Sequence, residues 1–551
     1  MIHHVEVQVL VLLLIASLVG MGARRIRVPY TLALVVAGLL LGFVRVDALH
    51  GLELGKDILL LLFLPALLFE AALHIDPREF RRELAPILLL AVPGVLVAVG
   101  VTTALLWLGI AATGLDPRLG WAEAALFAAV ICATDPVSVL ALFKELGVPR
   151  RLYLLVEGES LLNDGVAVVV FVILGAVLGI SGGEGLDGAR DVAAFGVRTF
   201  VWMVGAGVLI GLIVGGAVSA LTRQIDDHLI EVTLTTLVAY GSFLLAEQVH
   251  ASGVLSTVTA GIVMGSFGRS YGMSVSTRVA MEDFWEYLAF LANSFVFLLV
   301  GLQLEPAELW HDAPTIAVAF LAVLAGRALT VYLAAPVAGR LAAPIPTVWR
   351  HVLVWGGLRG SLSMVLALSL PPTFEGRALL VNLVFGVVAA SLFLQGLTVG
   401  PLLARLGVSG GREDRSAYEL ARLRALAARN GLEALEGQRV HLDERAFERL
   451  RAWYEARVQR AQVESAALAG DDVLDEQLVE GLQGLVDVER ETVRHAEAAG
   501  LVSAEVAEAL AVELDRRREA LEGAHRGEVQ RQAVLSAVFG DEEGEGRGGS
   551  G

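Results

Sequence analysis

The stretch LVEGESLLNDGVAVVVF, Leu155–Phe171, sets several polar side chains into a background hydrophobic enough for a membrane. Its charged and amide or hydroxyl residues are Glu157, Glu159, Ser160, Asn163 and Asp164. A charged side chain near the centre of a bilayer costs several kcal/mol, so it is expected to have a partner, a cavity or a function. The stretch therefore predicts a polar site inside a membrane protein.

The rest of the chain has the composition of a membrane protein with a polar extension. It has 551 residues, of which 56% are hydrophobic, and a mean hydropathy of +0.67. Apolar segments continue to about Arg405, and a charged sequence rich in Ala and Arg follows. We predict an all-α transmembrane domain over 1–405, a cytoplasmic helical domain over 406–540 and a disordered tail over 541–551.

Net charge and cysteine content exclude several classes of function. A net charge of −17 argues against nucleic-acid binding and against docking on anionic lipid headgroups. The single cysteine, Cys132, excludes a disulfide framework or a cysteine-based metal site within one chain. The start of the chain lacks a basic region and a small-residue cleavage site, so we expect a first membrane span and no removed signal peptide.

Apolar runs bounded by charges and by Gly or Pro turns predict thirteen membrane spans. They begin near residues 5, 30, 57, 84, 120, 151, 196, 229, 251, 284, 314, 349 and 377. An outside N-terminus places most loop arginines and lysines in the cytoplasm, as the positive-inside rule requires. The strong preference for arginine over lysine suggests a high-GC bacterial genome. We therefore expect a multi-pass protein of a bacterial inner membrane with its C-terminal domain in the cytoplasm.

Two of the predicted spans are interrupted. The fifth contains ATDPV, where Pro136 removes a backbone donor beside Asp135, and the twelfth contains GGLRGSLS around Arg359. If two six-span halves flank a central span, these are the fifth members of each half. Paired breaks of this kind are typical of inverted-repeat transporters, whose site lies where the broken helices meet.

Helical geometry separates the polar residues of the opening stretch into two sets. Ser160 and Asp164 are four positions apart and share one face, whereas Glu159 and Asn163 share an adjacent face. Asp164 lies roughly 20 Å along the span that begins near Arg151, which places it in mid-membrane. Desolvation disfavours a bare carboxylate there, so Asp164 is expected to hold a proton or a cation.

A hard monovalent cation needs oxygen ligands, which Asp164, Ser160 and carbonyls freed near Thr134 could supply. Competition between a proton and a cation for one carboxylate is sufficient for coupled exchange. The alternative from the residues alone is a buried aspartate satisfied by neighbouring helices and water. A remote alternative is an intramembrane aspartyl protease, in which Asp135 and Asp164 would be the two catalytic acids.

The motifs EGESLLNDG, ATDPV and GGLRGSLS together resemble the monovalent cation:proton antiporters of the sodium/proton exchanger type, in the prokaryotic NhaP-like branch. The resemblance covers roughly residues 1–405. It implies a thirteen-helix fold of two inverted six-helix repeats with crossed broken helices, a homodimer and elevator-type alternating access.

The resemblance also implies roles for individual residues. Asp164 would be the carboxylate that binds ion and proton, with Asn163 as its companion amide and Ser160 and Thr134 lending oxygens to Na⁺. Asp135 would cap a half-helix. Glu159 and Arg359 would form a buried ion pair that holds the core together. Glu70 would be a ligand or an attracting charge near the cytoplasmic entrance, the alternative being a snorkelling structural acid.

The expected function is electroneutral exchange of one Na⁺ for one H⁺ in pH and sodium homeostasis. Related electrogenic antiporters carry two adjacent aspartates and an intramembrane lysine, whereas this chain has Asn163-Asp164 and no lysine was expected within a span. K⁺/H⁺ or mixed Na⁺/K⁺/Li⁺ exchange is the alternative, because the ligand types are the same.

We expect no enzymatic activity, no cofactor beyond the transported ions, and lipid and a second copy of the chain as partners. The role of Glu157, the partner of Arg327 and the role of the C-terminal domain, scaffold or regulator, stay open.

Overall fold

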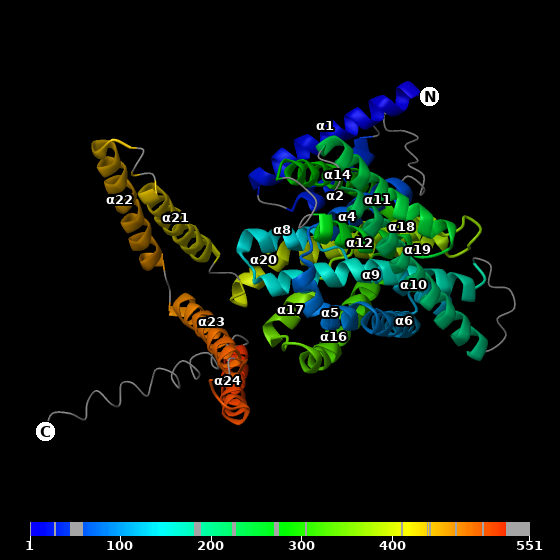
Figure 1. Cartoon of the computed structure of the whole chain (residues 1–551). Coiled ribbons are helices and arrows are strands. Elements are labelled where there is room, and N and C mark those ends of the chain that lie inside the picture. Colours follow the sequence, from blue (N-terminus) through cyan, green and yellow to red (C-terminus); the bar gives the residue numbers. More distant parts are fainter. Residues whose placement is uncertain are drawn as a thin grey trace. The chain divides into compact units, whose positions relative to one another are not determined.

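We analyse a computed structural model of the chain (Figure 1). It describes residues 2–26, 29–44, 59–180, 189–222, 227–268, 275–303, 306–408, 412–437, 439, 442–468, 471–498 and 501–524. Every regular element within these ranges is a helix. The tail predicted at 541–551 and the helical pattern predicted beyond 524 lie outside them. The chain divides into two compact units, Met1–Ser409 and Gly410–Gly551, which are described separately.

The first unit is an all-α polytopic assembly, as the sequence predicts. Seven of its described helical segments are long and apolar enough to cross a membrane, and five shorter apolar helices accompany them. Each predicted span corresponds to a helical segment. The unbroken ones are α1 (Ile2–Ile26), α2 (Tyr30–Val44), η2 with α4 (Leu59–Phe63, Leu64–Leu73), α5 with α6 (Pro77–Ala91, Pro93–Thr113), α9 (Arg150–Val177), α10 (Ala189–Thr222), α11 (His228–Gln248), α12 with η3 (Gly253–Val263, Met264–Gly268), α14 (Val275–Gln303), α16 (Ala313–Leu341) and α19 with η4 and α20 (Arg377–Ala390, Ser391–Gln395, Gly396–Arg405). The short helix α15 (Pro306–His311) precedes α16.

The two predicted breaks are confirmed. The fifth span consists of α7 (Trp121–Ile131) and α8 (Val137–Leu146), and the twelfth consists of α17 (Thr347–Trp355) and α18 (Ser361–Ser369). The two non-helical connections lie against each other, because the backbone N–H of Asp135 donates to the carbonyl of Leu358 at 2.8 Å. A Cβ on Gly360 would lie 2.1 Å from the Cβ of Asp135, so only glycine permits this approach.

Another close approach holds α2 against α14. A Cβ added to Gly38 would lie 2.2 Å from the carbonyl oxygen of Leu298, and one added to Gly301 would lie 2.2 Å from that of Val35. Small residues at such crossings let helix backbones pack directly, which is how helices associate where lipid removes the hydrophobic drive between them.

The second unit contains two helix pairs, α21 (Arg412–Gly437) with α22 (Glu444–Leu468) and α23 (Asp471–Ala498) with α24 (Ala504–Ala524). Gly431 of α21 faces the ring of Tyr454, and Phe447 is fully buried. Trp453, also on α22, is half exposed. Arg490 bridges to Asp515 at 2.6 Å between α23 and α24.

Candidate cation-binding site

A cavity of about 290 Å³ lies where the connection between α7 and α8 meets α4, α9 and α18. Carboxylate and hydroxyl groups from four of these segments line it, among them Glu70, Thr134, Glu157, Ser160, Asp164 and Ser363. Thus α9, which carries the EGESLLNDG motif, contributes Ser160 and Asp164 to the same cavity. The predicted division of its polar residues into two faces is what the packed helix shows.

One carboxylate oxygen of Asp164, which lines this cavity, has no partner among the described residues. This Oδ1 atom is buried and makes no hydrogen bond within the part of the chain that the structure describes. Nearby, Ser160 Oγ donates to the carbonyl of Thr134, and Thr134 Oγ1 donates to Ser160 Oγ at 3.3 Å. These oxygens have the hard character that a Na⁺ ion prefers. Among the described residues, His, Cys, Asp and Glu do not gather into a transition-metal site.

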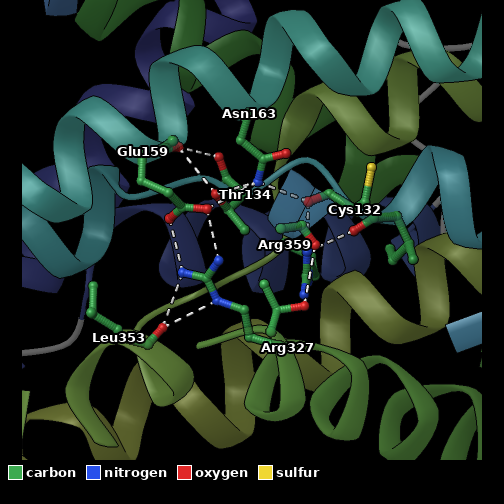
Figure 2. A network of polar contacts seen from close by, with 11 residues as sticks. Cys132, Thr134, Glu159, Asn163, Arg327, Leu353 and Arg359 are labelled. Carbon is green, nitrogen blue, oxygen red and sulfur yellow. Dashed lines mark hydrogen bonds and ion pairs between the residues drawn. The ribbon is translucent and has the colours of Figure 1, made fainter. Parts of the chain in front are cut away.

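Asn163 ties α9 to the broken fifth span. Its Nδ2 atom donates to the carbonyl of Cys132 at 3.0 Å and to Thr134 Oγ1 at 3.3 Å, and it lies 3.4 Å from Glu159 Oε1 (Figure 2). The side chain is 1% exposed, and its Oδ1 has no hydrogen-bond partner among the described residues. Asn163 therefore fixes the carbonyl of Cys132 and the hydroxyl of Thr134.

Glu159 pairs with Arg327, and the predicted pair with Arg359 is wrong. Arg327 Nη1 and Nη2 donate to the two carboxylate oxygens of Glu159 at 2.7 and 2.8 Å, and both residues are buried (Figure 2). The guanidinium also donates to the carbonyl of Leu353 through Nε at 3.2 Å and Nη2 at 3.1 Å. This two-pronged contact joins α9 to α16 and to α17 and identifies the partner of Arg327 that the sequence left open.

Arg359 is satisfied by backbone instead of by a carboxylate. Its Nη1 atom donates to the carbonyls of Ile131 at 2.9 Å and Cys132 at 2.8 Å, where α7 ends (Figure 2). The last carbonyls of a helix lack intrahelical partners and carry partial negative charge, so they attract a cation. The break in the fifth span therefore creates the binding site for the arginine of the twelfth.

Asp135 makes the reciprocal contact. Its Oδ1 accepts a hydrogen bond from the backbone N–H of Val137 at 3.0 Å, in the first turn of α8, and its carboxylate also accepts one from the backbone of Ser361, in the first turn of α18. A carboxylate is stabilised at helix N-termini by the orphan N–H groups and by the positive end of the dipole. Each broken span thus supplies one charge: Asp135 binds backbone N–H groups of both spans, and Arg359 binds carbonyls of the fifth.

The remaining charged residues of the cavity belong to α4, to the last turn of α8 and to the N-terminal part of α9. Glu70 is 3.4 Å from His74 Nδ1, and Tyr153 Oη donates to Glu157 Oε1 at 3.3 Å. Glu157 is 5% exposed and lines the cavity, so it is not a solvated residue at the helix start. Lys144 belongs to the last turn of α8 and also lines the cavity, so the expectation that no lysine lies within a span is wrong.

This geometry can be compared with known proteins. The sequence model of a family described as "Sodium/hydrogen exchanger, transmembrane" matches residues 10–405. The chain belongs to this sodium/hydrogen exchanger family. It is accordingly a membrane-integral, multi-pass member of a transporter family, and the matched range contains both broken spans and the whole cavity.

Individual members of the exchanger family agree with this assignment. The Na(+)/H(+) antiporter NhaG of Bacillus atrophaeus is 38% identical over 425 residues, which is 76% of this chain and 78% of that protein. The Na(+)/H(+) antiporter ApNhaP of Aphanothece halophytica is 40% identical over 405 residues, 73% and 74% of the two chains. The solved structure of the sodium proton antiporter MjNhaP1 from Methanocaldococcus jannaschii shares the fold, with a TM-score of 0.59 at 18% identity over 74% of this chain and 99% of that one.

Sequence reasoning on this exchanger missed two features of the site. It identified Arg327 as a cation that needs a partner but had already given Glu159 to Arg359. It also overlooked Ser363, which follows the GGLRG glycines and lines the cavity. The only available signal was the second serine of GSLS, near the start of a half-helix. A serine at that position is equally compatible with an ordinary helix residue.

Proposed function

We propose that this chain is a Na⁺/H⁺ antiporter in which Asp164 carries either the proton or the cation. The buried and unpartnered Oδ1 of Asp164, next to the oxygens of Thr134 and Ser160, is the observation that supports this most strongly. Relatives named as Na(+)/H(+) antiporters, at 38–40% identity, support Na⁺ as the cation. The protein needs no cofactor, because an ion gradient drives the exchange.

The exchange is electroneutral, with one proton for one Na⁺. Charge balance within the site supports this ratio. The carboxylate of Glu159 is neutralised by Arg327, and that of Asp135 is held by backbone N–H groups. Asp164 remains as the inner carboxylate whose charge is free to be balanced by a mobile ion. Lys144 lies at the end of α8 and not beside the break, so it does not replace the mid-membrane lysine of electrogenic relatives.

Transport follows an elevator-type alternating access in a homodimer. The broken helices and their reciprocal charge contacts support a rigid core that can move as one body around the bound ion. The N-terminus lies outside and the C-terminal unit lies in the cytoplasm of a bacterial cell, where the antiporter contributes to pH and sodium homeostasis.

The geometry disfavours the aspartyl protease alternative. Such an enzyme needs two catalytic carboxyl groups that share a proton and a water molecule. The Asp135 carboxylate is instead bound by backbone groups at the starts of α8 and α18, and Arg359 is bound to the end of α7. These contacts make Asp135 a structural residue of the crossing.

Proteoliposomes with an imposed pH gradient test the proposal. Addition of Na⁺ should drive proton flux that persists when valinomycin and K⁺ clamp the membrane potential. Flux with K⁺ alone, measured with the potential clamped by another means, would assign the alternative cation. A Na⁺-induced membrane potential would contradict the one-for-one ratio, and absence of flux with any monovalent cation would contradict antiport itself.

A further inference from the structure

Ser363 has a buried hydroxyl at the cavity, and no described protein group forms a hydrogen bond with it. It is 0% exposed, and its Oγ has no hydrogen-bond partner within the described ranges. The residue lies in the first turn of α18 and lines the same cavity as Asp164, Ser160 and Thr134. Buried polar atoms in proteins nearly always have partners, so an unpartnered one at a cavity points to a group that the cavity receives.

The same helix shows what an ordinary serine does. Ser369, at the other end of α18, donates its hydroxyl to the carbonyl of Leu366 at 2.7 Å. This local bond is the usual way in which a helical serine satisfies itself in an apolar environment. Ser363 makes no such bond among the described residues, and the residues one turn back, Arg359 and Gly360, precede the helix. Its oxygen is therefore not committed to the backbone.

Ser363 lines the cavity from a different helix than the predicted ligands do. Ser160 and Asp164 come from α9, and Thr134 comes from the broken fifth span. Ser363 comes from the broken twelfth span, which contacts both α7 and α9. Two buried oxygens without partners among the described residues, Asp164 Oδ1 and Ser363 Oγ, thus belong to residues that line one cavity from different elements.

We propose that Ser363 Oγ is a further ligand of the transported cation, contributed by the second broken helix. The inference rests on the proposed antiport and extends its site. A neutral hydroxyl binds a cation directly through its lone pairs, whereas a proton on Asp164 is held by a covalent bond and needs no further ligand. Ser363 therefore raises the affinity for Na⁺ more than the affinity for H⁺, and it shifts their competition toward the cation.

Ser363→Ala, with Ser369→Ala as the matched control on the same helix, tests the proposal in proteoliposomes. For Ser363→Ala we expect the apparent KM for Na⁺ to rise about tenfold, the size expected for one lost ligand, with the maximal proton flux kept. Ser369→Ala should retain the wild-type KM. An unchanged KM in Ser363→Ala, or an equal rise in the control, would overturn the proposal.

Ser363→Cys separates a ligand from a merely structural hydroxyl. A thiol has nearly the same shape but is a soft donor that suits soft cations better than Na⁺. The purified full-length chain in detergent should lose most of its Na⁺-induced gain in Tm in this variant yet keep the gain induced by Tl⁺. Equal loss for both ions would assign Ser363 a packing role. If the wild type itself lacks Na⁺-driven flux, the proposed function fails, whereas wild-type exchange with an unaltered Ser363→Ala contradicts this inference alone.

Discussion

Glu159 and Asp164 are five positions apart on α9, and the fold gives their carboxylates different surroundings. Arg327 binds both oxygens of Glu159, whereas Asp164 Oδ1 has no partner among the described residues. A buried carboxylate that forms a bidentate ion pair with an arginine has its charge permanently balanced. In the proposed mechanism, one without such a partner is stabilised by a mobile ion, so Asp164 and not Glu159 would carry the transported ion.

Removing one member of the Glu159–Arg327 pair should destabilise the protein strongly. Arg327→Gln leaves the Glu159 carboxylate buried and unpaired, at a cost of about 3–5 kcal/mol. A double-mutant cycle with Glu159→Gln, measured by unfolding in detergent, should give a coupling energy of about 2–3 kcal/mol. The parallel cycle of Glu159→Gln with Arg359→Gln should give a much smaller coupling energy. If the coupling of Glu159 with Arg359 were instead the larger of the two, the pairing predicted from the sequence would be correct.

The pH dependence of transport follows from competition at Asp164. As the pH falls, a larger fraction of Asp164 carries a proton and cannot bind Na⁺. Below the pH at which the empty site is half protonated, each further unit should raise the apparent KM for Na⁺ by about tenfold while saturating Na⁺ restores binding. Initial rates over a grid of pH and Na⁺ concentration measure this, and a KM independent of pH would contradict a shared carboxylate.

The sequence predicts the faces of α9 on which these residues lie better than it predicts the partners of the arginines. Helical spacing alone separates Ser160 and Asp164 from Glu159, because a helix has a fixed angle per residue. It does not distinguish Arg327 from Arg359 as the partner of Glu159, because both are membrane arginines and their tertiary positions are not in the pattern. Arg359 binds the free carbonyls of Ile131 and Cys132 instead of a carboxylate. These are backbone groups, so no side-chain motif predicts the contact.

At the scale of elements, charged side chains from the two broken helices neutralise the free backbone groups at the breaks. Asp135 from one connection binds backbone N–H groups at the starts of α8 and α18, and Arg359 from the other binds carbonyls at the end of α7. Pro136 and the glycines of GGLRG predict where the breaks occur. The exchange of charges across the crossing follows only from the packed structure.

Gly360 should not tolerate a side chain. An added Cβ would lie 2.1 Å from the Cβ of Asp135, so Gly360→Ala must separate the two connections and should abolish Na⁺/H⁺ exchange. Gly100→Ala on α6 is the matched control, because nothing lies within 4 Å of its added Cβ. We expect the control to transport normally in proteoliposomes. Normal exchange by Gly360→Ala would show that the crossing is looser than described.

At the scale of the whole chain, the transport machinery lies within one compact unit. The cavity, both broken spans and the family match all fall before Ser409, and the hydrophobic cluster of α23 and α24 is separate from those of the first unit. A unit with its own core can fold independently. The amphipathic pattern predicts helices in the second unit, but it carries no motif that assigns them a task.

A chain truncated after Ser409 should therefore fold and exchange Na⁺ for H⁺. Size-exclusion chromatography in detergent checks its folding, and proteoliposome flux checks its transport. A folded truncated protein with an altered pH profile would make the second unit a regulator. Loss of the folded state would make it a scaffold and would contradict the independence of the first unit.

The central claim is that proton and cation share Asp164, and proton release on Na⁺ binding measures this directly. Na⁺ is added to the purified protein in weakly buffered detergent solution, and the released protons are titrated against the bound Na⁺, with Asp164→Asn and Ser369→Ala as comparison variants. The account predicts up to one proton released per Na⁺ bound, with the ratio falling as the starting pH rises, for the wild type and Ser369→Ala, and none for Asp164→Asn. Sodium binding without proton release across the pH range, or release that persists in Asp164→Asn, would contradict it.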